Sequence, residues 1–144
     1  MEVKIKKLHP DAVVPTYAHI GDAGMDVTAV SVNVTDDYVE YDTGLAFEVP
    51  EGCVMLIFPR SSNSKKDLLL CNSVGVLDCI YRGPLKLRFK LMQPKYSSQD
   101  HKIYGVGDRV GQIMILPYPT IQFKEVEELS DTDRGEGGFG SSGK

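Results

Sequence analysis

LKLRFKL, residues 85–91, is the stretch that decides the fold, because apolar and basic side chains alternate along all of it. The apolar members are Leu85, Leu87, Phe89 and Leu91, and the basic members are Lys86, Arg88 and Lys90. Successive side chains of an extended chain point to opposite faces, so the apolar set shares one face and the basic set the other. The pattern predicts a β-strand with one face in the core and one in water.

Shorter stretches of the same kind occur on both sides of this segment, with Gly and Pro between them. The segments that we predict as strands are VKIKKL (3–8), MDVTAVSVNV (25–34), LAFEVP (45–50), CVMLIF (53–58), GQIMILPY (111–118) and TIQFKEVEEL (120–129). No long helical period appears, and SSNSKKDLL (61–69) predicts one short helix capped by Ser61 or Ser62. Many short strands separated by turns predict an all-β fold, which is a sandwich, a jelly roll or a barrel.

The composition is that of one globular domain, with 42% apolar and 25% charged residues among 144. Its one shift comes near residue 130, which predicts a single domain over 1–130 and a separate tail over 131–144. No apolar run approaches the roughly 18 residues of a membrane span. The first ten residues, MEVKIKKLHP, lack the apolar core of a signal peptide. We therefore expect no membrane partner and a cytoplasmic location.

Charge and cysteine content narrow the classes of function. The net charge of −4 argues against a broad nucleic-acid footprint, so we expect no nucleic-acid partner. Cys53, Cys71 and Cys79 are an odd number without CxxC spacing, which argues against a disulfide framework and against a zinc site. Free thiols are typical of a reducing compartment.

Four of the five arginines lie in turn-like segments beside Gly, or beside Pro and Ser. The segments are PRSS (59–62), YRGP (81–84), GDRVGQ (107–112) and DRGEGG (133–138). Turns expose backbone N–H groups, and an arginine beside them can grip phosphate through charge-assisted hydrogen bonds. An exposed turn also accepts arginine without any ligand, so the pattern favours an anion site without requiring one.

The tail, DTDRGEGGFGSSGK (131–144), presents a similar choice. Its Gly and Ser content is typical of a flexible end or a linker. It nevertheless carries a guanidinium at Arg134 and an aromatic ring at Phe139, which a passive end does not need.

Two aspartates are candidates for chemistry. Asp26 lies at a Gly-rich strand entry, and Asp78 lies between Leu77 and Cys79. An ionised carboxylate inside an apolar strand needs a partner, so Asp78 is a candidate general base or metal anchor. An Asx turn at a hairpin is the alternative. Tyr81, three residues on, either packs in the core near that hairpin or lies flat on a sugar.

Five segments resemble the ordered motifs of the homotrimeric deoxyuridine triphosphatases, the dUTPases. They are AGMDV (23–27), PRSSNS (59–64), GVLDCIYRG (75–83), GDRVGQ (107–112) and RGEGGFGSSG (134–143). Their order and spacing cover nearly the whole chain, so the resemblance is highly specific. It implies a jelly-roll-like β subunit in a threefold homotrimer with three shared active sites. The first, second and fourth motifs of one subunit would face the third motif of a neighbour, and the fifth would arrive from the remaining subunit.

The reaction of the family is dUTP + water → dUMP + pyrophosphate, which lowers dUTP and supplies dUMP for thymidylate synthesis. The resemblance implies Mg²⁺ as cofactor, held mainly by the substrate triphosphate, with Asp26 acting on it through water. It also implies that Asp78 orients and deprotonates the water that attacks the α-phosphorus.

The resemblance further implies three sets of substrate-binding residues. The phosphate set is Arg60, Ser61, Ser62 and Gln112, the nucleoside set is Asn72, Gly75 and Tyr81, and the tail set is Arg134, Phe139, Gly140 and Ser141. The hairpin around residues 72–87 would read uracil chiefly through backbone groups, and Tyr81 would fill the space that a ribose 2′-OH needs. Phe139 would stack on the uracil, and Arg134 would bind the terminal phosphate.

The chain departs from the family after its second motif, where it reads SNSKKD (62–67) and members often carry a small apolar residue such as Ala. The roles of Arg82, Asp108 and Arg109, in the site or in trimer contacts, are left open. One alternative function is a dCTP deaminase of related trimeric fold, which would need an acid–base residue at the base end. Others are a non-catalytic nucleotide sensor, which needs no base for water, and a structural jelly-roll protein, which needs no clustered arginines.

Overall fold

The computed structural model describes residues 1–92 and 102–140, and its regular structure there is almost entirely β. The strands are β1 (Lys4–Lys7), β2 (Met25–Thr28), β3 (Ser31–Val34), β4 (Val39–Glu48), β5 (Cys53–Phe58), β6 (Leu68–Leu70), β7 (Gly75–Leu77), β8 (Pro84–Leu91) and β9 (Arg109–Pro117). A 3-10 turn, η1 (Ser61–Lys65), is the one helical element of the described residues. The predicted all-β class is therefore confirmed.

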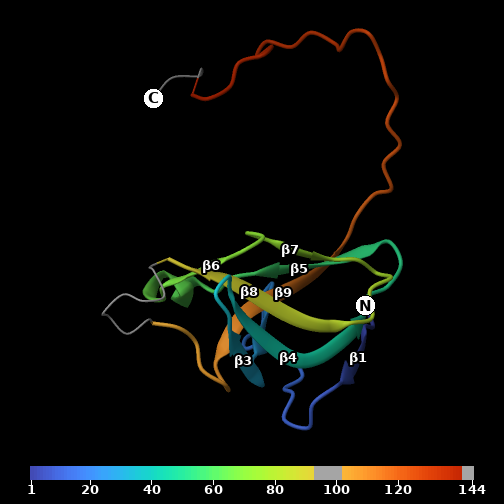
Figure 1. The fold of residues 1–144 in the computed structure, drawn as a ribbon. Helices are drawn as coiled ribbons and strands as arrows, with labels where there is room; N and C mark the ends of the chain where they lie inside the picture. Colours follow the sequence, from blue (N-terminus) through green and yellow to red (C-terminus); the bar gives the residue numbers. More distant parts are fainter. Residues whose placement is uncertain (93–101, 141–144) are drawn as a thin grey trace.

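The strands form two antiparallel sheets, which Figure 1 shows as two layers. In the first sheet the order is β1-β4-β8-β6, with β3 also paired to β4. In the second the order is β2-β9-β5-β7. Strands that are distant in sequence are neighbours in both sheets, so the chain crosses repeatedly between the layers, as expected of a jelly-roll-like subunit.

Residues 85–91 form the greater part of β8, as the alternation predicts. Leu85, Leu87 and Phe89 are buried, and the basic residues between them face solvent. Phe89 lies opposite Val39 of β4 on one side and opposite Leu70 of β6 on the other. This strand therefore holds the middle of its sheet.

The core lies between the layers and draws on both of them. Tyr41 and Phe89 enter it from the first sheet, and Met55, Ile113 and Val27 enter it from the second, all fully buried. Burying one such apolar side chain contributes roughly 1.5–3 kcal/mol. Closely packed sheets of this kind give the loops at their rims a rigid base.

The segment 25–34, predicted as one strand, is two strands in different sheets. β2 pairs with β9, and β3 pairs with β4. The register shifts between Val27 and Thr28, and the chain then crosses, held by hydrogen bonds from Ala29 N to Asp108 O (3.0 Å) and from Val30 N to Asp42 O (2.8 Å). The apolar alternation continues through the crossing, which is why the sequence conceals it.

The predicted short helix at 61–69 is shorter and of another type. η1 spans five residues, and Arg60 rather than a serine stands at its N-cap, without a side-chain capping bond. The Ser64 hydroxyl instead donates to Ser61 O at 2.8 Å within the turn. Lys66 is extended, so the helix ends there and residues 68–70 pair as β6.

The strand predicted over 120–129 does not form. β9 ends at Pro117, and residues 118–140 leave the two sheets as an extended segment, coloured orange to red in Figure 1. Ile121, Phe123 and Leu129 are 68%, 92% and 88% exposed. The apolar pattern that predicted a strand thus has nothing to pack against within the described part of one chain. No helix among the described residues has the length and apolar character needed to span a membrane.

Candidate functional site

The nucleoside set predicted from the sequence surrounds one hollow of about 490 Å³ beside the loop that joins β7 to β8, which we call the hairpin groove. The hairpin predicted around residues 72–87 does not form as a paired hairpin, because β7 and β8 lie in different sheets. Asn72, Gly75, Asp78 and Tyr81 all line it. Its apolar walls come from Ile57, Leu70, Leu77, Leu85 and Leu87. Charged side chains, Glu40, Asp78, Lys86 and Arg88, line the rest of it. Apolar walls together with polar groups suit a flat ring that carries hydrogen-bonding edges.

Both strands that border the groove present edges without a strand partner among the described residues. β7 pairs only with β5. On the side of β8 that faces β6, strand pairing involves only the last residues of β8, Phe89 to Leu91. Residues 84–88 of β8 line the groove, and the carbonyls of Pro84, Leu85 and Arg88 already accept hydrogen bonds from Tyr81, Thr43 and Cys71. A Cβ at Gly75 would lie 3.0 Å from Ile57 Cδ1 and 3.1 Å from Ile57 Cβ, so a larger residue would disturb this wall.

Asp78 is the first residue after β7, and it is exposed. The sequence predicted it inside an apolar strand, and that placement is wrong, because β7 ends at Leu77. The alternative prediction, an Asx turn, requires a hydrogen bond to the carboxylate of Asp78, and the hydrogen bond at this turn goes elsewhere. The backbone carbonyl of Asp78, not its carboxylate, accepts the N–H of Tyr81 at 3.0 Å. The turn so formed leaves the carboxylate open at the mouth of the groove.

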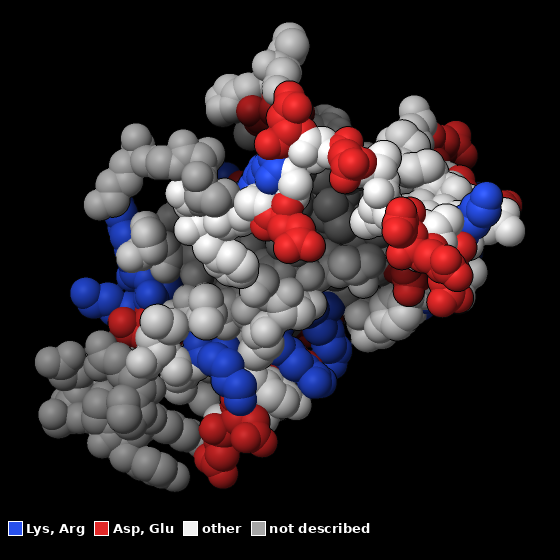
Figure 2. All heavy atoms as spheres, turned by 90° about the horizontal axis from the view of Figure 1, so that it is seen from above, with Lys and Arg blue, Asp and Glu red and all other residues white. Residues whose placement is uncertain are grey.

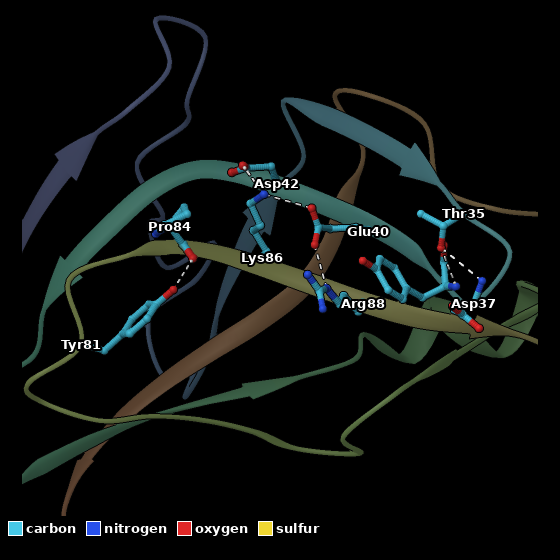
Figure 3. A network of polar contacts seen from close by, with 9 residues as sticks. Thr35, Asp37, Glu40, Asp42, Tyr81, Pro84, Lys86 and Arg88 are labelled. Carbon is cyan, nitrogen blue, oxygen red and sulfur yellow. Dashed lines mark hydrogen bonds and ion pairs between the residues drawn. The ribbon is translucent and has the colours of Figure 1, made fainter.

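Tyr81 and Arg82 fix the loop that carries Asp78. The Tyr81 hydroxyl donates to Pro84 O at 3.2 Å, across the base of the loop, as Figure 3 shows. Arg82 Nη1 donates to Cys79 O at 2.5 Å and to Tyr81 O at 2.9 Å. The sequence left the role of Arg82 undecided; within one chain, its side chain holds this loop.

Gln112 of the phosphate set and the predicted metal residue Asp26 line a second hollow, of about 600 Å³. We call it the arginine pocket because Arg60 and Arg109, although they do not line it, bind the carboxylate of Asp26. Asp26, Pro59 and Gln112 line it, and Gln112 lies opposite Asp26 in the pairing of β9 with β2. The Gln112 amide donates to Pro59 O at 3.3 Å, which ties β9 to the segment that carries Arg60. A Cβ at Gly24 would lie 3.1 Å from Gln112 Oε1, so Gly24 allows this close approach.

Two arginines converge on the carboxylate of Asp26. Arg60 binds it with both ends of its fork, Nε to Oδ1 at 2.7 Å and Nη2 to Oδ2 at 3.2 Å. Arg109 Nη1 donates to Oδ2 at 3.0 Å. Paired forks of this kind are among the strongest ion pairs in proteins, and both partners are partly buried, with side chains 22% and 27% exposed. Arg109, whose role the sequence left open, thus joins Arg60 on a carboxylate that lines the pocket.

The remaining members of the phosphate set lie on η1. Ser62 Oγ accepts a hydrogen bond from Arg60 Nη1 at 3.1 Å, whereas Ser61 is exposed. Asp108 has a local task, because its Oδ2 accepts the N–H of Gly105 at 2.8 Å and so closes the turn before β9.

The donor set of the arginine pocket fits Mg²⁺ only through water. A carboxylate offers about four acceptor positions, and the two arginines fill three of those on Asp26. One position on Oδ1 stays open for a metal-bound water. The described residues hold no group of three or more His, Cys, Asp or Glu that could bind a metal. Mg²⁺ that keeps its waters and takes its other ligands from phosphates needs no such group.

The hairpin groove and the arginine pocket share no lining residue. Within one chain, the predicted nucleoside residues thus line one hollow, whereas Gln112 and Asp26, with the arginines bound to Asp26, lie at the other; we call these two groups the nucleoside and phosphate half-sites.

The described members of the tail set, Arg134, Phe139 and Gly140, lie away from both half-sites (Figure 1). Arg134 Nε donates to Gly137 O at 2.8 Å inside a local turn, and Phe139 is fully exposed. Gly140 has a φ of 87°, which glycine adopts easily. Ser141 lies outside the described residues.

Sequence reasoning missed a polar network in the lining of the hairpin groove. Glu40 of β4 accepts hydrogen bonds from Lys86 Nζ at 3.0 Å and from Arg88 Nε at 2.7 Å, as Figure 3 shows. Burial alone would raise the pKa of Glu40, but the two hydrogen bonds outweigh burial and hold the pKa below its ordinary value. Only the pairing of β4 with β8 brings these residues together, so no local sequence pattern could have revealed the network.

Comparison with known proteins gives one consistent family. A family model for dUTPase matches residues 11–143. The deoxyuridine 5′-triphosphate nucleotidohydrolase of Escherichia phage T5 is 40% identical, over 98% of this chain and 98% of its own length. The protein of the same name from Rhodococcus erythropolis is 38% identical, over 99% of this chain and 87% of its own length.

Solved structures agree. A variant of the Staphylococcus bacteriophage 80alpha dUTPase with dUpNHpp has a TM-score of 0.82 and 30% identity, covering 99% of both chains. A dUTPase variant from phage phi11 of S. aureus, described with a coordinated structural Mg(II) ion, has a TM-score of 0.74 and 25% identity, covering 91% of this chain and 100% of that one. The range matched by the family model contains both half-sites and most of the tail.

Proposed function

The chain belongs to the dUTPase family, whose reaction is the hydrolysis of dUTP to dUMP and pyrophosphate, and on that premise we propose how its own residues carry out this reaction. The observation that carries the proposal is the division of the predicted residues between a groove lined by Asn72, Asp78 and Tyr81 and a pocket whose Asp26 carboxylate holds two arginines. Each half-site offers the chemistry that one end of dUTP requires.

Asp78 acts as the general base. Its carboxylate takes a proton from water as the water oxygen bonds to the α-phosphorus, and the bond from that phosphorus to the bridging oxygen of pyrophosphate breaks. Exposure at the mouth of the hairpin groove leaves the carboxylate free to meet such a water. A residue buried in a strand, as the sequence suggested, could not do so without rearrangement.

Arg60 and Arg109 supply positive charge for the triphosphate, and Ser62 and Gln112 supply hydrogen bonds. Asp26 holds both guanidiniums in place before substrate arrives, so little reorganisation is needed when phosphate binds. Mg²⁺ on the triphosphate would add charge neutralisation, and Asp26 would hold one of its waters through the open position on Oδ1.

Selection of the substrate falls to the hairpin groove. Backbone groups of β7 and β8 read the uracil edge, with Asn72 beside them. Tyr81, anchored to Pro84, excludes a ribose 2′-OH by occupying its space. The thymine methyl is excluded because Gly75 and Ile57 already lie in close contact at this wall.

We further propose that three copies assemble as a homotrimer with shared sites. An apolar row runs across the outer face of the second sheet. Its members are Val54, Leu56, Val76, Met114 and Leu116, which the strand register places side by side. Figure 2 views the molecule from the side of β5 and β7, and uncharged surface fills much of this face between the charged side chains. Monomers rarely expose contiguous apolar surface of this kind.

The apolar row adjoins the arginine pocket, because Met114 belongs to both. A neighbouring copy that covers the row would therefore bring its own surface to the pocket, where a hairpin groove could complete the site. The chain after Pro117, with its exposed apolar residues, would pack on a neighbour, and the tail over 131–144 would reach a third copy's substrate. Three free cysteines are compatible with a reducing cytoplasm as the place of reaction.

The decisive experiment measures pyrophosphate release with Mg²⁺ from dUTP, dTTP, dCTP and UTP, together with ammonia release from dCTP. We expect pyrophosphate from dUTP far above the other nucleotides. Ammonia release from dCTP would identify a deaminase, and binding of dUTP without turnover would identify a sensor.

A further inference from the structure

Tyr104 lies outside all five family-like segments, yet it touches the predicted phosphate set. It is only 3% exposed, and its backbone is clamped by the phenol of Tyr41. The Tyr41 hydroxyl donates to Tyr104 O at 3.1 Å and accepts the N–H of Tyr104 at 3.0 Å. The two rings meet edge to face with centroids 6.0 Å apart. Tyr104 is therefore fixed to the core by both its backbone and its ring.

The hydroxyl of Tyr104 contacts Ser62 of the predicted phosphate set. It lies 3.4 Å from Ser62 Oγ, which accepts a hydrogen bond from Arg60 Nη1 at 3.1 Å. Arg60 in turn grips Asp26. A continuous line of contacts thus runs from the core to the residues that we assign to the triphosphate.

Lys66 supports Tyr104 from the other side. Its Nζ lies 4.7 Å from the centre of the Tyr104 ring, within the range of a cation–π interaction, and donates to Ile103 O at 3.0 Å. Lys66 belongs to the SNSKKD segment (62–67), which the sequence analysis singled out. Asn63 of the same segment donates from Nδ2 to Leu68 O at 2.8 Å. The unusual segment thus ties η1 to its surroundings.

Such a support has a physical reason. η1 is a single 3-10 turn with no capping side-chain bond at Arg60 and no buried residue of its own. A turn this short is not stable alone, and a binding group must be held within about 0.5 Å to be effective. We propose that Tyr104 is a positioning residue that holds Ser62, and through it Arg60, in the geometry that receives the triphosphate, with Lys66 steadying its ring. This inference rests on the proposed function.

The test is a double-mutant cycle of Tyr104→Phe and Ser62→Ala. Tyr104→Phe keeps the ring and removes the hydroxyl, so the melting temperature should stay close to that of the wild type. Because the contact is long, we expect the affinity for dUpNHpp to fall about two- to fivefold. The affinity for dUMP, which lacks the β- and γ-phosphates, should not change. In the Ser62→Ala background, Tyr104→Phe should have no further effect, because its contact is already lost.

Tyr38→Phe is the matched control, since it also removes one phenol hydroxyl but its ring packs on Arg88, with 4.4 Å between the ring centre and Arg88 Cζ. It should leave both affinities unchanged. Equal losses for dUpNHpp and dUMP, additive effects in the cycle, or no loss at all would overturn the inference. Pyrophosphate release by the wild type tests the proposed function separately. If the wild type hydrolyses dUTP and Tyr104→Phe binds dUpNHpp as tightly as the wild type, only the role of Tyr104 is refuted.

Discussion

At the scale of the residue, Asp78 and Asp26 show how much of a side chain's role is set by its immediate bonds. The sequence identified both as candidates, because carboxylates in apolar or Gly-rich settings are uncommon. It misplaced Asp78, since the apolar residues around it concealed the end of β7. For Asp26 it could not reveal the two arginines, which lie 34 and 83 residues away along the chain.

Asp78→Asn should abolish turnover while dUTP still binds. The amide keeps the size of the side chain but cannot accept the proton of the attacking water, and a general base contributes roughly 10²–10⁴ in rate. Steady-state pyrophosphate release and calorimetric binding of dUpNHpp would measure the two effects. A variant that keeps a kcat near that of the wild type would remove Asp78 from the mechanism.

Tyr81→Ala should weaken discrimination against UTP more than it harms the use of dUTP. The smaller side chain opens the space for a 2′-OH, and the lost bond to Pro84 loosens the loop. Tyr81→Phe separates these effects, because it loses only the bond. The ratio of kcat/KM for UTP to that for dUTP should rise with alanine and stay near the wild-type value with phenylalanine. An unchanged ratio in both variants would mean that selectivity lies elsewhere.

At the scale of the element, apolar–polar alternation predicted strands well where one face of the strand packs in the core of the same chain and the other face is exposed to solvent. β8 and β5 have one face in the core, and their boundaries follow the pattern closely. The segment 120–129 carries a similar pattern but no strand, because nothing in the described chain covers its apolar residues. Local pattern records which residues prefer burial, and it does not tell which chain buries them.

Glu40→Gln should destabilise the protein by about 1–2 kcal/mol at pH 7, because Lys86 and Arg88 lose a charged partner. The loss is no larger because both cations stay partly solvated. The folded-state pKa of Glu40 is below its ordinary value of 4.5, so the unfolded chain takes up its proton first as pH falls. The stabilisation is therefore complete above about pH 4.5 and disappears as pH falls through the folded pKa.

Thermal melts of wild type and Glu40→Gln at one protein concentration, at pH 7 and pH 3, would show the difference in melting temperature shrinking at the lower pH. Glu48→Gln is the control, because Glu48 and Lys4 form a pair that is well exposed, with side chains 44% and 71% accessible. A Glu40 effect that is as large at pH 3 as at pH 7 would show that its charge is not the cause.

At the scale of the whole molecule, the features left unexplained in one chain belong together. The half-sites are separate, the apolar row adjoins one of them, and the chain after Pro117 extends away from both sheets (Figure 1). Each feature would be satisfied by neighbouring copies, and a closed ring satisfies head-to-tail contacts without leaving any open. Sequence alone could suggest this arrangement only through family resemblance, because no residue pattern encodes which copy supplies which surface.

Two truncations would separate the tasks of the C-terminal segment. Ending the chain after Asp133 removes Arg134 and Phe139 but no strand, so we expect an intact trimer by light scattering. Its kcat/KM for dUTP should nevertheless fall severely, because the lost stacking alone is worth about 1–3 kcal/mol in nucleic-acid systems. Ending the chain after Pro117 also removes Ile121, Phe123 and Leu129, whose exposure in one chain points to a partner.

The second truncation should therefore weaken assembly itself, giving smaller species on dilution and a melting temperature that depends on concentration. The comparison matters because loss of activity alone does not distinguish a missing lid from a missing trimer. A chain ended after Asp133 that hydrolyses dUTP at the full-length rate would reduce the tail to a passive end. A stable trimer from the chain ended after Pro117 would assign assembly to the apolar row alone, and the exposed residues of 118–130 would need another explanation.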